Sequence, residues 1–171
     1  MAVTRTLLKN LAQSGLGPAQ VLQRANALLV QDNDESMFVT LFVGLYDTKT
    51  GRLQYANGGH NPPYLLDAQG NVLSVCKATG PIVGVIEGQD FAQGEIKIEV
   101  GNELVLYTDG VTEAHAEGGE LFGEKRFEKL LSQHAGEKVE RLCDVIVKTV
   151  NEYQKGNQYD DITLLVLRRN E

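Results

Sequence analysis

The sequence predicts an α+β domain in which antiparallel strands are covered by helices. Three observations support this prediction. Two helical patterns open the 171-residue chain, a block of short apolar strands separated by Gly- and Asp-rich turns follows, and two more helical patterns precede one last strand. Because helical and strand segments are grouped rather than alternating, a parallel sheet built from βαβ units is disfavoured. The length suits a single domain.

Two helices are expected at the start. Apolar residues recur at helical spacing in the first helix, before "SGLG" ends it: Val3, Leu7, Leu8 and Leu11. Pro18 fits the first position of the second helix. The inner face of that helix is expected to consist of Val21, Leu22, Ala25, Leu28 and Leu29. No capping residue precedes the first helix, which resembles an interrupted helix more than a designed start.

The central block is expected to consist of strands. "MFVTLFVGLY", residues 37–46, is almost continuously apolar, which predicts a strand covered on both faces. "DTKTG" turns the chain into a partner strand over residues 52–57. After the tight loop "GGHNPP", short strands are expected at "YLLD" and "VLSV", a half-exposed strand at "GEIKIEV" and another strand at "ELVLYT".

The last third returns to helices. Helices are predicted over residues 124–133 and 137–153. The inner side of the second comprises Val139, Leu142, Val145, Ile146 and Val150. "DDITLLVLRR" then forms the final strand.

Composition excludes some partners. The net charge of −7 and the pI near 5.0 give no basic footprint, so nucleic acid is not an expected partner. No apolar run reaches the roughly 18 residues of a membrane span, and the first residues lack the features of a secretion signal. We therefore expect no membrane insertion and a cytoplasmic location. Cys76 and Cys143 lie in no metal-binding spacing and are expected to be free thiols.

Carboxylates lie at the ends of two apolar strands. Asp109 follows "LVLYT", and Asp160 and Asp161 precede "ITLLVL". A carboxylate there is costly unless a positive charge meets it. If the two strands are antiparallel neighbours, these acids converge on one rim of a sheet, where oxygen ligands suit Mg²⁺ or Mn²⁺. Gly110 would let the backbone approach the ion, and Glu113 could reach it through water.

The residues alone leave another interpretation open. Asp-Gly is a common turn dipeptide, so Asp109 could be a turn residue or a helix cap. The Asp160-Asp161 pair could simply be a polar strand boundary.

Four segments in order resemble one family. "MFVTLFVGLYDTKTGRLQYANGGHNPPYLL", "TDGVTEA", "GELFG" and "DDITLLVL" are similar to the bacterial SpoIIE-like branch of the PPM-type metal-dependent serine/threonine protein phosphatases. The resemblance covers essentially the whole chain, which would form a single domain over residues 1–171. It implies an α-β-β-α sandwich of two antiparallel sheets flanked by helices. It also implies a two-metal centre of Mn²⁺ or Mg²⁺ at one rim, which activates water to attack phosphorus.

The resemblance assigns roles to particular residues. Asp109 and Asp160 match metal ligands of the family and would be the catalytic pair. Asp160 is preferred to Asp161 because the ligand is the first residue of that pair in the family. Gly110 belongs to the same metal site, and Glu113 occupies the place of an acid linked to an additional metal.

The sequence also departs from the family pattern. An aspartate-containing strand and a Gly-rich "DGxG"-like motif are expected before the first helix, and neither occurs in these residues. The chain is therefore expected to be the larger C-terminal part of the domain: a fragment, a chain started at an internal methionine, or a degenerate protein. Asp109 and Asp160 alone would give an incomplete site of low activity.

Other residues could have either a functional or a structural role. His60 and Asn61, in "NGGHNPP", are candidates for the metal rim, but a structural turn is favoured. His115 could meet the substrate phosphate, whereas His134 is expected at a helix end. Phe122, in "GELFG", is expected to anchor its loop by packing.

Two functional interpretations remain, and a third is disfavoured. The first is a phosphatase whose implied substrate is phosphoserine or phosphothreonine on an anti-sigma-factor antagonist, with an upstream sensor or receiver domain and homodimerisation as further expectations. The second is a non-catalytic or truncated module that binds or regulates. Haloacid-dehalogenase-type chemistry, suggested by "DGVT", needs a nucleophilic Asp at position 107, where this chain has Tyr107.

Overall fold

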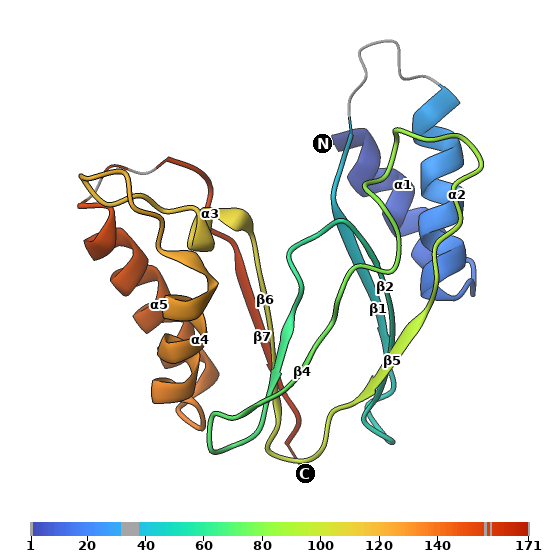
Figure 1. Ribbon diagram of the computed structural model, residues 1–171. Helices are drawn as coiled ribbons and strands as arrows, with labels where there is room; N and C mark the ends of the chain where they lie inside the picture. Colours follow the sequence, from blue (N-terminus) through green and yellow to red (C-terminus); the bar gives the residue numbers. More distant parts are fainter. Residues whose placement is uncertain (1, 32–37, 156, 158, 171) are drawn as a thin grey trace. The chain divides into compact units, whose positions relative to one another are not determined.

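The computed structural model describes residues 2–31, 38–155, 157 and 159–170. The chain divides into two compact units, Met1–Pro62 with Cys76–Lys97 and Pro63–Val75 with Ile98–Glu171. Each unit contains one antiparallel sheet and its own helices (Figure 1). The predicted α+β class with two antiparallel sheets flanked by helices is therefore confirmed.

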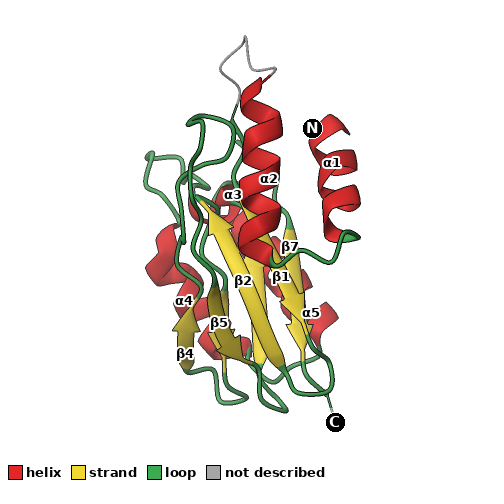
Figure 2. Ribbon diagram, turned by 90° about the vertical axis from the view of Figure 1, so that its right-hand side faces the viewer, coloured by secondary structure: helices red, strands yellow, loops and turns green. Residues whose placement is uncertain are grey.

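The first unit has a three-stranded sheet. It comprises α1 (Ala2–Ala12), α2 (Pro18–Gln31), β1 (Leu41–Tyr46), β2 (Arg52–Gly58) and β5 (Gly94–Lys97). The strand order is β1-β2-β5, and both pairings are antiparallel. The two helices run side by side (Figure 2), and α2 contacts β1 and β2. The half-exposed alternation predicted for "GEIKIEV" is present in β5.

The inner face of α2 differs from the prediction at one position. Leu22 and Ala25 are buried in the core of this unit, as expected, but Leu28 is 38% exposed. Asn26 takes the inner position instead: its amide donates to the Ile86 carbonyl at 2.7 Å, and its oxygen accepts from the Gly84 N–H at 2.8 Å. The helix tolerates this buried amide because its donor and its acceptor both satisfy the backbone of a neighbouring loop.

The prediction for the first strand was wrong in two respects. The described strand begins at Leu41 rather than residue 37, which lies outside the described residues. Cover on both faces is also absent among the described residues, since Phe38 is 64% and Leu45 57% exposed. The physical reason is that β1 belongs to an antiparallel sheet, where helix cover need not extend over both faces: Leu41 and Val43 pack in the core that includes α2, and Leu45 does not.

The second unit has a four-stranded sheet. Its strands are β3 (Tyr64–Leu66), β4 (Val72–Val75), β6 (Glu103–Tyr107) and β7 (Leu164–Arg168), in the order β4-β3-β6-β7. All three pairings are antiparallel. The two strands predicted to carry carboxylates, β6 and β7, are therefore neighbours.

Helices α4 (Gly123–His134) and α5 (Val139–Tyr153) complete the second unit, and α5 lies along β7 (Figure 1). Their apolar faces join one core with β3 and β6. Buried in it are Tyr64, Tyr107, Phe127, Leu131, Leu142, Ile146 and Val150. This confirms the inner side predicted for the last helix at Leu142, Ile146 and Val150, while Val139 and Val145 are half-buried.

A buried ion pair links β6 to β7 far from the carboxylate rim. Glu103 is fully buried and lies opposite Arg168 in the register. The Arg168 Nε donates to Glu103 Oε1 at 2.9 Å, its Nη2 donates to the same oxygen, and the Gly136 N–H donates to it at 3.1 Å. Glu103 Oε2 has no hydrogen-bond partner among the described residues. Because a buried charge without its partner is costly, this pair favours one register.

Two smaller expectations, on the cysteines and on His134, are also confirmed. Cys76 and Cys143 are both free, as predicted. His134 ends α4, and its Nδ1 lies 3.0 Å from Glu137 Oε1. Within the described part of the chain, no helix is long and apolar enough to cross a membrane.

Candidate metal centre

The β6–β7 pairing brings the predicted acids to one end of the sheet. The register ends at Tyr107 opposite Leu164. The chain leaving β6 therefore continues through Asp109 beside the segment that enters β7 from Asp160. The antiparallel arrangement on which the metal hypothesis depended is present, although β7 begins at Leu164 and not at the carboxylates.

Thr108 ties the two segments together. Its N–H donates to the Thr163 carbonyl at 3.1 Å, and its hydroxyl donates to the Asp161 carbonyl at 2.9 Å. The same hydroxyl oxygen accepts from the Thr163 N–H at 2.9 Å. One side chain thus extends the β6–β7 contact beyond the last strand pair and fixes the backbone on both sides of the rim.

Asp109 opens the short helix α3 (Asp109–Thr112). Its side chain is exposed, and Oδ1 accepts from the Gly110 N–H at 3.1 Å. The helix-cap alternative is not supported, because Thr108 is the N-cap residue of α3. The turn alternative agrees in part with the structure, because Asp109 lies where the chain turns from β6 into α3.

Gly110 lies directly against the other arm of the rim. A Cβ atom at this position would be 2.6 Å from the carbonyl oxygen of Asp161 and 3.4 Å from the carbonyl carbon of Asp160. Only a glycine permits this approach without a shift of backbone. The predicted reason for the glycine, close backbone approach, therefore agrees with the geometry.

A pocket of about 230 Å³ lies at this rim. Six residues line it: Gly110, Glu113, Ala114, His115, Tyr159 and Asp160. Three of the predicted site residues, Gly110, Glu113 and Asp160, therefore share one pocket. Asp109 and Asp161 are exposed neighbours of these residues but do not line it.

His115 and Tyr159 form the aromatic part of this pocket. Their ring centroids are 4.9 Å apart, at an interplanar angle of 49°. His115 Nδ1 is buried and has no hydrogen-bond partner among the described residues. Sequence reasoning considered His115 but missed Tyr159, although Tyr159 directly precedes Asp160 and its position was the available signal.

His60 and Asn61 belong to the other unit. The His60 N–H donates to Asn57 Oδ1 at 2.8 Å, Asn57 Nδ2 donates to the His60 carbonyl at 3.0 Å, and His60 Nδ1 lies 3.1 Å from Thr40 Oγ1. These bonds describe a structural turn, the role favoured for His60.

The residues at the rim fit a divalent cation only in part. Their oxygens are hard ligands, they are exposed to water, and the backbone at Gly110 makes room beside Asp160. Within residues 2–31, 38–155, 157 and 159–170, however, no group of three or more His, Cys, Asp or Glu side chains is placed to hold a metal ion. The described chain therefore offers part of a ligand set.

Comparison with known proteins agrees with the fold and the order of motifs. Residues 1–170 match the family described as stage II sporulation protein E (SpoIIE). Phosphoserine phosphatase RsbU of Bacillus subtilis is 31% identical over 169 residues, which cover 99% of this chain and 50% of RsbU. The chain therefore spans about half the length of this relative.

Solved structures share the fold. The SiaA-PP2C domain of Pseudomonas aeruginosa has a TM-score of 0.83 at 23% identity, over 96% of this chain and 67% of that domain. The phosphatase domain of SpoIIE from Bacillus subtilis, presoaked with Mn, has a TM-score of 0.70 at 18% identity, over 98% and 72% of the two chains. The fold is that of PP2C-type phosphatase domains. By its sequence match, the chain belongs to the SpoIIE family.

Proposed function

We propose that this chain forms the larger, C-terminal part of a metal-dependent serine/threonine protein phosphatase domain. Its substrate would be phosphoserine or phosphothreonine on a regulatory protein of the anti-sigma-factor antagonist type. The observation that carries the proposal is the β6–β7 rim, where Gly110, Glu113 and Asp160 share one pocket beside Asp109. The relative RsbU, which is named a phosphoserine phosphatase, supports the reaction class.

In this proposal the rim residues have separate tasks. Asp109 and Asp160 would hold Mn²⁺ or Mg²⁺ directly, Glu113 would act from an outer position, and Gly110 keeps the space between the two arms open. When bound, the metal supplies Lewis acidity toward phosphoryl oxygens and activates water as the nucleophile. Thr108 holds both arms in place, so the acids do not have to reorganise when the ion binds.

The partial ligand set favours a second candidate function. A module that keeps the fold and binds or regulates without catalysis would need no complete metal centre, and the described residues contain no group of three ligands. Segments carrying the family's upstream aspartates would complete the site in a catalytic protein. An upstream sensor or receiver domain and homodimerisation remain predictions of the same proposal.

The experiment compares this chain with an upstream-extended chain that carries the two missing motifs. The extended chain should hydrolyse p-nitrophenyl phosphate in a Mn²⁺-dependent manner, and the 171-residue chain should show little activity. Asp109→Asn in the extended chain should lower turnover by about 100-fold, because even changes to the outer partners of metal ligands cost roughly 10–100-fold in metal affinity or activity. Asp144→Asn, which replaces an exposed carboxylate on α5, is the matched control and should leave turnover unchanged.

Mn²⁺ binding measured by calorimetry gives a readout that does not depend on turnover. Asp109→Asn should weaken binding while the free energy of unfolding changes by less than about 0.5 kcal/mol, as for other exposed positions. Full activity in the Asp109→Asn protein would exclude the metal assignment. An inactive extended chain with no Mn²⁺ affinity would favour the binding module.

A further inference from the structure

One wall of the pocket is carried by a small hairpin, residues 114–122. The Phe122 N–H donates to the Ala114 carbonyl at 2.8 Å, and the Ala116 N–H donates to the Glu120 carbonyl at 2.9 Å. Between these bonds, His115 and Leu121 form an antiparallel bridge. The outgoing arm supplies Ala114 and His115 to the pocket, whereas the returning arm faces α4 and α5.

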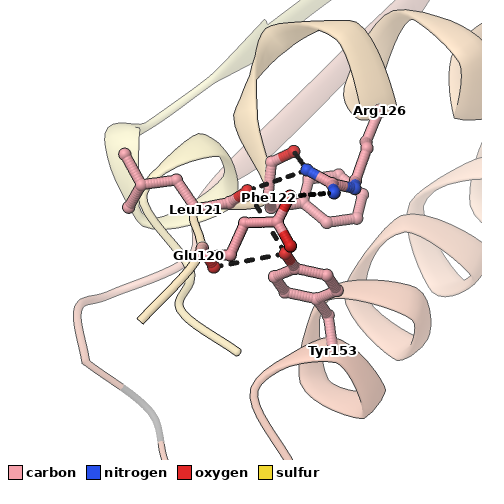
Figure 3. Close-up of polar contacts among 5 residues, drawn as sticks. All are labelled: Glu120, Leu121, Phe122, Arg126 and Tyr153. Carbon is pink, nitrogen blue, oxygen red and sulfur yellow. Dashed lines mark hydrogen bonds and ion pairs between the residues drawn. The ribbon is translucent and has the colours of Figure 1, made fainter. Parts of the chain in front are cut away.

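The returning arm is held by Arg126 of α4 (Figure 3). Arg126 Nη1 donates to the carbonyl oxygens of Leu121 at 3.0 Å and Phe122 at 3.1 Å, and Nη2 lies 2.5 Å from Glu120 Oε1. A guanidinium can do this because it presents several donors in a fixed plane. Its bonds to the two carbonyls hold the backbone itself, which the exposed ion pair with Glu120 alone would not do.

Tyr153, in the last turn of α5, holds the same arm from another element (Figure 3). Its hydroxyl lies 3.2 Å from the carbonyl oxygens of both Glu120 and Leu121, which share its one proton. The Tyr153 ring packs edge-to-face on Phe122 at 5.2 Å, and the Arg126 guanidinium lies over it at 5.4 Å. Phe122 is buried, as the sequence predicted for an anchor.

A third contact reaches the outgoing side of the hairpin. Lys155, just after α5, forms an ion pair with Glu117. Its backbone is left-handed, with φ of 49°, a conformation that most residues avoid. The end of α5 therefore reaches the hairpin through Tyr153 and Lys155, while α4 reaches it through Arg126.

The hairpin backbone carries His115 into the pocket wall. Its buried Nδ1 has no hydrogen-bond partner among the described residues, and its ring contact is with Tyr159, whose side chain is 60% exposed. The backbone of the hairpin therefore contributes to the place of the imidazole. That backbone is set in turn by the bonds to its returning arm.

We propose that Arg126 and Tyr153 are positioning residues that fix the 114–122 hairpin and thereby hold His115 in the pocket wall, where it binds the phosphorylated substrate. The role of His115 toward substrate rests on the proposed function. The support of the hairpin by Arg126 and Tyr153, which we call the clamp, involves residues of this chain alone. It can therefore be tested without measuring catalysis.

The first test is hydrogen exchange followed by NMR on the 171-residue chain. Tyr153→Phe keeps the ring on Phe122 but removes the hydroxyl, so the amides of Ala116, Gly119 and Phe122 should exchange about five-fold faster, as for the loss of one net hydrogen bond. Amides within β6 should keep their rates. Arg141→Met is the matched control, because Arg141 makes an exposed ion pair with Glu137 and its described bonds do not reach the hairpin.

Arg126 offers a graded version of the same test. Arg126→Met should speed exchange in the hairpin more than Arg126→Lys does, since lysine can keep the pair with Glu120 but cannot reproduce the planar fork. Unchanged hairpin exchange in both the Tyr153→Phe and Arg126→Met proteins would overturn the clamp.

The second test is a double-mutant cycle in the upstream-extended chain. Tyr153→Phe and His115→Ala should each lower kcat/KM toward a phosphoserine peptide, by about five-fold and about ten-fold respectively. The double variant should be no worse than His115→Ala, because both changes act through one side chain. Additive losses would overturn the link to His115. Accelerated exchange in a protein with no phosphatase activity would support the clamp and overturn the proposed function instead.

Discussion

Two polar loops of this protein use similar residues in opposite ways. The first loop, taken here with the end of β2, contains Asn57, Gly59 and His60, and the rim after β6 contains Asp109, Gly110 and His115. In the first loop, the buried Asn57 side chain bonds to the carbonyls of His60 and Cys76 and accepts from the His60 N–H. At the rim, the carboxylates are exposed, and His115 Nδ1 has no hydrogen-bond partner among the described residues.

The difference distinguishes polar groups that stabilise the fold from polar groups that can bind a ligand. A polar group whose bonds are all made inside the chain stabilises the fold and has little left to offer a ligand. A polar group held in place by others, with its own bonding capacity facing a pocket, can bind one. Two properties can be tested: how well the bonds around Asn57 shield the first loop from solvent, and how much the rim depends on Gly110.

The largest expected difference is between the two thiols. Cys76, whose carbonyl binds Asn57, is fully buried, and burial raises the pKa of its thiol to about 12. The pKa of Cys143 is raised as well, mainly by burial, but this side chain is only half-buried. Because the thiolate is the reactive form, Cys143 should be labelled by a thiol reagent at pH 8 at least about 100-fold faster than Cys76. Mass spectrometry of the peptides measures both rates, and equal rates would contradict a closed loop.

Asn57→Ala should break the first loop. It removes the bonds to the His60 and Cys76 carbonyls and leaves the His60 N–H without its acceptor, so the free energy of unfolding should fall by about 2–3 kcal/mol. Urea unfolding measures the loss, and Cys76 labelling should accelerate in the same protein. Asn61→Ala, in the same loop but half-buried, should change stability by less than about 0.5 kcal/mol. Equal losses in the two variants would show that the network around Asn57 is not what holds the loop.

Gly110→Ala should disturb the rim. The added Cβ would meet the Asp161 carbonyl oxygen at 2.6 Å, so the two arms must separate, at a cost of about 1–2 kcal/mol in stability and with weaker Mn²⁺ binding. Gly118→Ala, at the tip of the 114–122 hairpin, is the control, since no atom lies within 4 Å of its Cβ position. Thermal unfolding and calorimetric titration would measure both variants, and a Gly110→Ala protein that binds Mn²⁺ as tightly as the original would argue against close approach at this site.

The sequence was informative where a local pattern decides the outcome. Helical periodicity predicted α4 and α5, and Pro18 marked the start of α2. The acids after β6 and before β7 could be placed on one rim because antiparallel pairing of two neighbouring strands has only one such end. The family resemblance supplied the two antiparallel sheets flanked by helices, which periodicity alone does not give.

The remaining features depend on contacts between distant residues. The continuous apolar run of β1 is typical of a buried strand, yet which of its residues are covered depends on contacts with α2, which the run itself does not reveal. Asn26 is buried because its side chain bonds to a loop about 60 residues away in the sequence. Tyr153 and Arg126 read as ordinary helix residues, and only their bonds to the 114–122 hairpin reveal a role near the pocket.

The buried pair of Glu103 and Arg168 has an evolutionary consequence. Losing Arg168 alone would leave a fully buried carboxylate without its counter-charge, and losing Glu103 alone would leave the guanidinium with the Glu137 carbonyl but no carboxylate, so either single change is disfavoured. Replacement by a well-packed apolar pair can be nearly neutral, but only when both positions change together. Homologues should therefore show these two positions covarying, and any lineage that exchanged them must have crossed an unstable intermediate or changed both at once.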